Sequence, residues 1–246
     1  MNGEAGQAGY LLCGTPRTGS TLLCGALTAT GIAARPESYF REQDELQWAA
    51  RLRVRAEGNH VLDYDELASA ARRAGTTPNG VFGARVMWGT LEVMLTRLRQ
   101  AWSTANRDDL AILEQAFGPL RFIYLRRQDV VAQAVSWARA EQTGYWQEGD
   151  QHTKTPPRYD HARVDDLVHT IGVHNDAWRT WFAANDIHPH EISYELLITD
   201  VPGTVQSALA FLGLEDGDVG HPVPGTARQA DHINAEWITR YLTGSG

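Results

Sequence analysis

Lysine is almost absent from this 246-residue chain, because Lys154 is the only lysine among its 22 basic residues. Any chemistry that depends on a lysine must therefore use arginine or be missing. Cysteine is scarce too, and Cys13 and Cys24 are too few for a disulfide framework. No apolar run approaches the roughly 18 residues of a membrane span. The first nine residues lack the basic and apolar regions of a secretory signal. We therefore expect a cytoplasmic protein.

The composition is that of a globular chain. Hydrophobic residues make up 43% and charged residues 21%, which is too apolar for a disordered protein. The net charge of −8 argues against broad nucleic-acid binding. No repeat or convincing linker interrupts the sequence. We expect residues 1–246 to form a single domain, with residues 1–8 as a flexible N-terminus.

Short apolar runs alternate with helical patterns along the chain. The patterns predict strands at 9–14, 81–88, 122–125 and 192–194, and helices at 20–30, 62–73, 91–102, 130–139, 164–184, 205–212 and 235–242. Strands separated by helices indicate an α/β fold of three layers, with a central, mostly parallel sheet between helices and right-handed crossovers. Residues 142–163 are rich in proline, glycine and polar side chains, so they predict either a lid or an ordinary surface loop.

A glycine-bounded turn follows the first predicted strand. It reads Gly14-Thr-Pro-Arg-Thr-Gly19-Ser-Thr21 and stands before a helix, where backbone N–H groups can bind an anion. The spacing is P-loop-like, but Ser20 occupies the lysine position, which counts against a kinase or nucleoside triphosphatase. Arg17 supplies a cation instead. The simpler interpretation is a tight turn with a solvated arginine.

A second candidate anion site follows the strand at 122–125. Arg126 and Arg127 end that strand, and Asp129 is a good N-cap for the next helix. Ser136 lies two helical turns beyond Asp129 on the same face. An arginine and this serine could together bind a phosphate; alternatively, one arginine pairs with Asp129 and Ser136 is a small buried residue. Because ligands of open α/β sheets bind beyond the carboxyl ends of the strands, both sites point to one edge.

These two motifs resemble those of sulfotransferases that use 3′-phosphoadenosine 5′-phosphosulfate (PAPS). Pro16-Arg-Thr-Gly-Ser-Thr21 is similar to that family's 5′-phosphosulfate loop, and its arginine form followed by Leu-Leu looks like the bacterial trehalose sulfotransferase branch. The resemblance runs over about residues 10–241. It implies that Arg17 takes the role of the loop's basic residue, and that Arg127, or Arg126, binds the 3′-phosphate with Ser136.

Two downstream segments add to the resemblance. One region of the family resembles the segments Ile192-Ser-Tyr-Glu-Leu-Leu197 and Phe211-Leu-Gly213 of this chain. The resemblance would put Tyr194 near the adenine; alternatively, this tyrosine belongs to the core. Arg228 follows a Pro/Gly-rich loop in a segment whose counterpart closes over the nucleotide. The residues that the resemblance assigns to PAPS are Pro16, Arg17, Thr18, Gly19, Ser20, Thr21, Arg127, Ser136, Tyr194 and Arg228.

The acceptor side is expected in the segment Arg35-Pro-Glu-Ser-Tyr-Phe40. A transferase of this type needs a base for the acceptor hydroxyl, and the resemblance assigns that role to Glu37. Tyr39 and Phe40 could form a sugar-facing wall. The segment 79–88 resembles a strand of the trehalose sulfotransferase branch, in which a lysine stands at the position of Arg85. Arg85 either stabilises charge at the site or forms a structural ion pair. His169 and His174, on the helix at 164–184, are alternative bases.

The sequence therefore predicts a PAPS-dependent sulfotransferase with Arg17 and Glu37 as catalytic residues. Its acceptor would be a hydroxyl of a trehalose-like carbohydrate or of another small alcohol, and its product adenosine 3′,5′-bisphosphate. The resemblance also implies a homodimer. His188-Pro-His190 lacks partners at ligand spacing, so no metal is expected. A kinase or nucleoside triphosphatase, and a nucleotide-binding homologue without turnover, are the alternatives.

Overall fold

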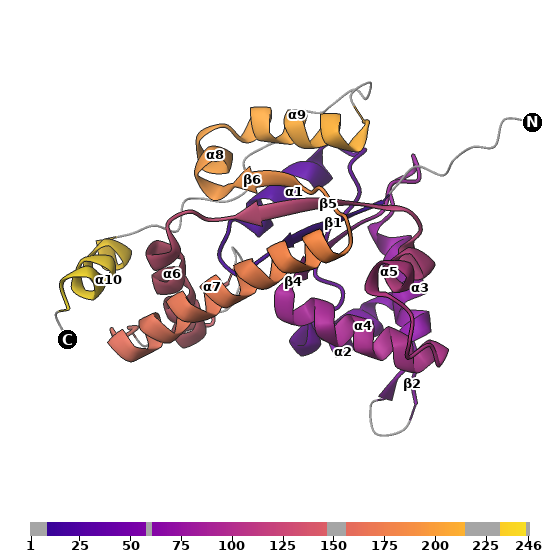
Figure 1. Ribbon diagram of the computed structural model, residues 1–246, viewed down its shortest axis with the longest axis horizontal. Coiled ribbons are helices and arrows are strands. Elements are labelled where there is room, and N and C mark those ends of the chain that lie inside the picture. Colours follow the sequence, from indigo (N-terminus) through magenta and orange to yellow (C-terminus); the bar gives the residue numbers. More distant parts are fainter. Residues whose placement is uncertain (1–8, 58–60, 147–155, 215–231, 245–246) are drawn as a thin grey trace, which may run out of the picture.

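The computed structural model describes residues 9–57, 61–146, 156–214 and 232–244. Four parallel strands form a sheet in the order β4-β1-β5-β6 (Figure 1). Their bounds are Gly9–Gly14 (β1), Gly83–Met87 (β4), Leu120–Arg126 (β5) and His190–Ser193 (β6). A separate antiparallel pair joins β2 (Ala56–Glu57) to β3 (Val61–Leu62). The α/β fold predicted from the sequence is confirmed.

Helices cover both faces of this sheet. Their bounds are Ser20–Ala29 (α1), Glu45–Leu52 (α2), Tyr64–Gly75 (α3), Trp88–Trp102 (α4), Asp109–Phe117 (α5), Val130–Thr143 (α6), His161–Ala184 (α7), Tyr194–Thr199 (α8), Val201–Leu212 (α9) and His232–Thr243 (α10). A 3-10 turn, η1 (Glu42–Asp44), precedes α2.

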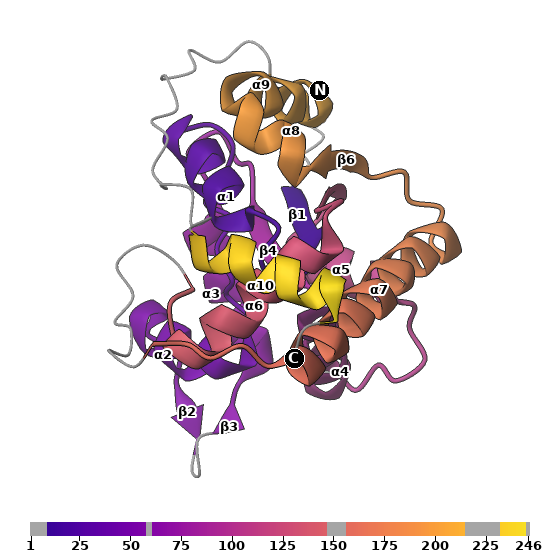
Figure 2. The ribbon, with the colours of Figure 1, turned by 90° about the vertical axis from the view of Figure 1, so that its left-hand side faces the viewer.

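The side chains of β1 alternate between two cores. Leu11 and Cys13 pack with α3, α4, α5 and α7 on one face, whereas Tyr10 and Leu12 pack with α1 and α9 on the other. This alternation follows from the two-residue period of a strand. It lets helices pack on both faces of the sheet, so the fold has three layers. A third cluster joins α6, α7 and α10 through Trp237, and Figure 2 shows α10 lying across α6.

The segment predicted as a long loop is shorter than the sequence suggested. Helix α6 continues to Thr143 and α7 already begins at His161, so both ends of 142–163 are helical. The Gln142 amide donates to the Arg158 carbonyl and accepts from the Arg158 N–H, which joins the two flanks. Residues 147–155, like residues 1–8 and Arg228, lie outside the described residues.

Candidate active site

The turn between β1 and α1 has the conformation that its glycines suggest. A Cβ on Gly14 would lie 2.7 Å from the Leu125 carbonyl oxygen, so glycine lets β1 approach β5. Arg17 and Gly19 both have a left-handed backbone, with φ of 68° and 82°. The Thr18 hydroxyl donates to the Thr15 carbonyl at 2.9 Å and closes the turn. Turns with left-handed residues form concavities that bind anions.

Arg17 reaches from this turn to the second motif. Its Nε donates to Ser136 Oγ on α6 at 3.0 Å, and its Nη1 donates to the Trp146 carbonyl. Burial, and next the positive charge of Arg127, lower the pKa of Arg17. Arg139 acts in the same direction. The side chains proposed for two different phosphates therefore lie together in one cationic cluster.

The two arginines at the end of β5 differ in what they face. The Arg127 guanidinium lies 4.4 Å from the centre of the Tyr194 ring, and that ring packs against Gly19, since a Cβ there would lie 2.8 Å from Tyr194 Cδ2. Arg126 instead pairs with Glu191 at 3.3 Å, with side chains 41% and 54% exposed. Arg127, and not Arg126, therefore lies beside the loop.

Tyr194 begins α8 rather than ending β6, which corrects the predicted strand 192–194. The strand ends at Ser193, whose hydroxyl accepts from the Leu196 N–H and caps the helix. The next residue, Glu195, accepts from the backbone N–H groups of Gln128 and Asp129 at 3.0 and 3.3 Å. Glu195 thereby fixes the turn between β5 and α6, a role that the amino-acid sequence did not indicate.

Helix α6 begins as predicted, because the Asp129 carboxylate accepts from the Ala132 N–H at 2.9 Å. Sequence reasoning missed Gln133 on the same helix. This side chain is fully buried, and its amide contacts Thr15 and Pro16 of the turn. The spacing of Asp129, Gln133 and Ser136 at i, i+4 and i+7 was the available signal, since such residues share one face.

Glu37 lies next to β4 at the edge of the sheet. It forms a parallel bridge with Ala84, and its carbonyl accepts from the Arg85 N–H at 3.0 Å. Glu37 is exposed, and its charge and that of Arg85 both act on Cys24 of α1. The chain after α1 therefore folds back along the sheet edge, as Glu37 would need in order to face the turn.

Arg85 connects the Glu37 segment to the start of α1. Its Nε donates to Ser38 Oγ at 2.7 Å, and its Nη1 donates to Thr21 Oγ1 at 2.9 Å and to Ser20 Oγ at 3.4 Å. Among the described residues no carboxylate pairs with it, so the structural ion pair that the sequence left open is replaced by contacts with hydroxyls. Arg85 therefore joins the two segments that carry Glu37 and Arg17.

Tyr39 and Phe40 do not form the sugar-facing wall that the sequence suggested, because both side chains are buried. Their exposed fractions are 2% and 0%, and both belong to the core beneath α3 and α5. The Tyr39 ring packs on Trp48, and its hydroxyl donates to the Arg35 carbonyl. Their hydrophobic area is worth more in the core than at the surface, which explains why the rings turn inward.

The alternative bases lie on α7. His169 is exposed, whereas His174 is half-buried. Burial lowers the pKa of His174, and Glu92 opposes this change.

The described residues contain no group of three or more His, Cys, Asp or Glu side chains that could hold a metal. None of the described helices is both long and apolar enough to span a membrane.

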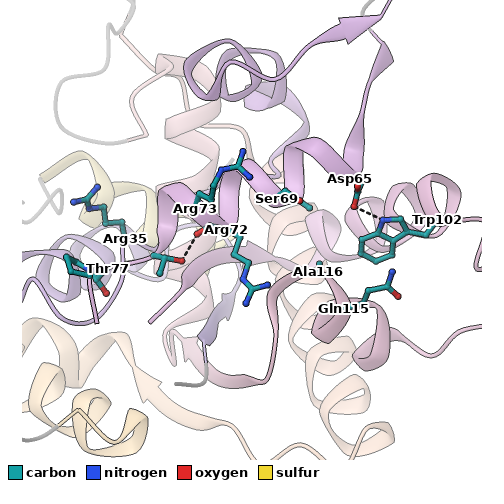
Figure 3. Close-up of a pocket in the computed structure, with 12 residues that line it drawn as sticks. Arg35, Asp65, Ser69, Arg72, Arg73, Thr77, Trp102, Gln115 and Ala116 are labelled. Carbon is teal, nitrogen blue, oxygen red and sulfur yellow. Dashed lines mark hydrogen bonds between the residues drawn. The ribbon is translucent and has the colours of Figure 1, made fainter. Parts of the chain in front are cut away.

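A groove of about 730 Å³ lies at the other end of the sheet. It is lined by α3, by the end of α5, and by residues 76–78 before β4, so it adjoins the amino ends of the strands. Figure 3 shows that its arginines, Arg35, Arg72 and Arg73, point in different directions. Asp65 in the groove accepts from the Trp102 indole at 2.7 Å. The groove is thus separate from the turn, and its cations do not converge.

Known proteins that are similar to this chain include two trehalose 2-sulfotransferases and one sulfotransferase domain. A trehalose 2-sulfotransferase of Mycobacterium tuberculosis is 30% identical in an alignment 252 residues long, gaps included, that covers 94% of this chain and 93% of that protein. One of Mycolicibacterium smegmatis is 29% identical over 255 residues, with the same coverage. A sulfotransferase domain from the olefin synthase of Synechococcus PCC 7002 aligns over 99% of this chain and 97% of its own, at 16% identity and a TM-score of 0.39. The family model of the Stf0 sulphotransferases matches residues 9–243, and the chain therefore belongs to that family.

Proposed function

We propose that this sulfotransferase moves the sulfuryl group of PAPS to a hydroxyl of a trehalose-like carbohydrate or another small alcohol. Adenosine 3′,5′-bisphosphate would be the second product. The observation that carries the proposal is the meeting of Arg17, Ser136, Arg127 and Tyr194 where β1, β5 and β6 end. Burial, and next the charge of Arg127, lower the pKa of Arg17, and a cluster of arginines with such mutual repulsion is suited to a polyanion.

The two ends of the donor would bind different parts of this cluster. The turn from Pro16 to Thr21 would hold the 5′-phosphosulfate through backbone N–H groups, hydroxyls and Arg17. Arg127 and Ser136 would hold the 3′-phosphate. Tyr194 lies under Arg127, where an aromatic face would also suit the adenine. Arg228, outside the described residues, stays a prediction.

The reaction would be an in-line displacement at sulfur. The acceptor oxygen forms a bond to sulfur while the bond from sulfur to the bridging phosphate oxygen breaks. The acceptor proton passes to Glu37, and Arg17 stabilises the negative charge on the departing phosphate. The sulfuryl group carries less charge than a phosphoryl group, so arginines and N–H groups can take the part that magnesium plays in phosphoryl transfer.

The position of Glu37 supports its role as the base. Arg85 ties its segment to Ser20 and Thr21, so the carboxylate belongs to a segment fastened to the phosphosulfate turn. Glu37→Gln keeps the size and hydrogen-bonding ability of the side chain but removes its capacity to accept the proton. His169 and His174 would be tested next if this variant kept normal turnover.

The acceptor class rests on the two trehalose 2-sulfotransferases to which the chain is similar. Because Tyr39 and Phe40 are buried, we assign them no contact with the acceptor. Ser38 and Arg85 are the polar groups nearest to Glu37 in the chain and in the sheet register, so they are our candidates for contacts to its hydroxyls. A homodimer stays a prediction, which light scattering would test.

Incubation with PAPS and a panel of acceptors tests the proposal directly. The panel contains trehalose, other glycosides and simple alcohols, and the mass gained by one sulfuryl group identifies the product. We expect transfer to at least one carbohydrate, without added metal. Magnesium-dependent turnover of ATP would favour the kinase alternative. Binding of PAPS without transfer to any hydroxyl would favour a homologue that has lost turnover.

A further inference from the structure

We infer that Gln133 is a positioning residue that sets the shape of the phosphosulfate turn, and with it the affinity for the 5′ end of the donor. This inference rests on the proposed function. Gln133 lies in α6, has an exposed fraction of 0%, and forms no part of the assignments made above. The side-chain amide of Gln133 donates to a hydroxyl and a backbone carbonyl of the turn rather than to its own helix.

The amide nitrogen of Gln133 makes both of these contacts. Its Nε2 donates to Thr15 Oγ1 and to the Pro16 carbonyl, each at 2.7 Å. The Pro16 carbonyl can only accept, so the nitrogen and not the oxygen must face it. Both amide hydrogens are thus committed to the turn, and the orientation of the side chain is determined.

This contact determines where the next N–H group points. The peptide between Pro16 and Arg17 is planar and trans, so its N–H lies opposite to its carbonyl. Because the carbonyl points to Gln133, the Arg17 N–H points away from α6. The backbone of Arg17 is left-handed, with φ of 68°, a conformation that costs energy for any residue with a Cβ. Gln133 therefore holds a strained peptide in the orientation that presents its N–H.

Helix α6 holds the side chain of the same arginine one turn later. Ser136 accepts from Arg17 Nε at 3.0 Å, while Gln133 fixes the carbonyl just before Arg17. The helix that supplies the proposed 3′-phosphate serine thus also sets the geometry at the 5′ end. The Gln133 Oε1 atom is buried and accepts no hydrogen bond from the described residues. A buried acceptor without a partner costs free energy, so it offsets part of the stability that the two hydrogen bonds of the amide nitrogen supply.

Two nucleotides separate a local effect on the turn from a general effect on α6. Adenosine 3′,5′-bisphosphate engages both ends of the proposed site, whereas adenosine 3′-monophosphate lacks the 5′ group. We expect Gln133→Met to weaken binding of the bisphosphate about tenfold or more, since hydrogen bonds to the turn are lost. Binding of the monophosphate should stay unchanged. The kcat/KM for PAPS should fall in parallel, with the KM for the acceptor unaffected.

Gln142→Met is the matched control. Gln142 lies on the same helix, and its amide also makes two hydrogen bonds, with the Arg158 backbone at 2.9 and 2.8 Å. This variant removes the same chemistry away from the turn, so both nucleotides should bind as they bind the unchanged protein. Gln133→Glu, which keeps the size of the side chain, is the second variant in case the methionine variant does not fold. It places an oxygen against the Pro16 carbonyl and should show the same selective loss.

The outcomes distinguish the inference from the function on which it rests. If the unchanged protein binds the bisphosphate better than the monophosphate, and folded Gln133 variants keep that preference in full, the inference is overturned alone. Equal weakening of both nucleotides would also overturn it, because Gln133 would then act through α6 as a whole. An unchanged protein that binds neither nucleotide would refute the proposed function and the inference together.

Discussion

Replacement of Arg127 by methionine should weaken the preference that we propose for a donor with a 3′-phosphate. Methionine keeps much of the apolar stem and loses the charge. The guanidinium of Arg127 lies over the Tyr194 ring at 4.4 Å, beside the turn that holds Arg17. The neighbouring Arg126 provides a control, since it differs by one position but faces Glu191.

The expected loss of affinity follows from the different surroundings of Arg127 and Arg126. A charge-assisted hydrogen bond from a half-buried arginine to a phosphate is worth roughly 1.5–3 kcal/mol. At about 1.4 kcal/mol for each factor of ten, the loss is about 10- to 150-fold in affinity. Arg126 and Glu191 form a pair whose side chains are 41% and 54% exposed, and such surface pairs contribute about 0–1 kcal/mol. Arg126→Met should therefore change the preference very little.

The assay compares PAPS with adenosine 5′-phosphosulfate, which lacks the 3′-phosphate. The ratio of the two kcat/KM values cancels changes that affect both donors equally, such as partial loss of active protein. We expect the ratio to fall about 10- to 150-fold for Arg127→Met and to stay constant for Arg126→Met. A full preference in the Arg127 variant, or its loss in the Arg126 variant, would refute the assignment of the 3′-phosphate to Arg127.

Four other substitutions or treatments test separate parts of the structure. Glu37→Gln should lower kcat by roughly 10²–10⁴-fold through loss of the base, with the Kd for PAPS nearly unchanged; normal turnover would move the role elsewhere. Arg17→Ala should weaken PAPS binding about 10- to 150-fold and slow transfer, and unaltered kinetics of the folded variant would exclude Arg17. Gly19→Ala should lower the Tm by roughly 2–8 °C, because φ is 82° and the new Cβ would lie 2.8 Å from Tyr194; calorimetry measures this. Burial raises the pKa of Cys24 to about 12, so its thiol stays protonated at pH 8 and iodoacetamide should modify it only after unfolding, as mass spectrometry would show.

The sequence by itself determined those strands, turns and helix caps whose conformation depends on a few neighbouring residues. The apolar run at 9–14 predicted β1, and the structure buries every residue of it. Gly19 was recognisable because a tight turn at this place requires a positive φ. The N-cap at Asp129 depends on one carboxylate and an N–H three residues later. Short helices such as α8 were missed, because six residues carry too little periodicity to be recognised.

The tertiary structure decided which of these residues meet. Arg17 and Ser136 are 119 residues apart in the chain and join in one hydrogen bond, which no local pattern contains. Arg126 and Arg127 have the same side chain, and only the packing of α8 against the turn shows which of them faces the site. Tyr39 and Phe40 were expected to face a sugar, but helices from distant parts of the chain bury them. Burial depends on contacts between distant segments, whereas a sequence pattern reports only the preferences of neighbours.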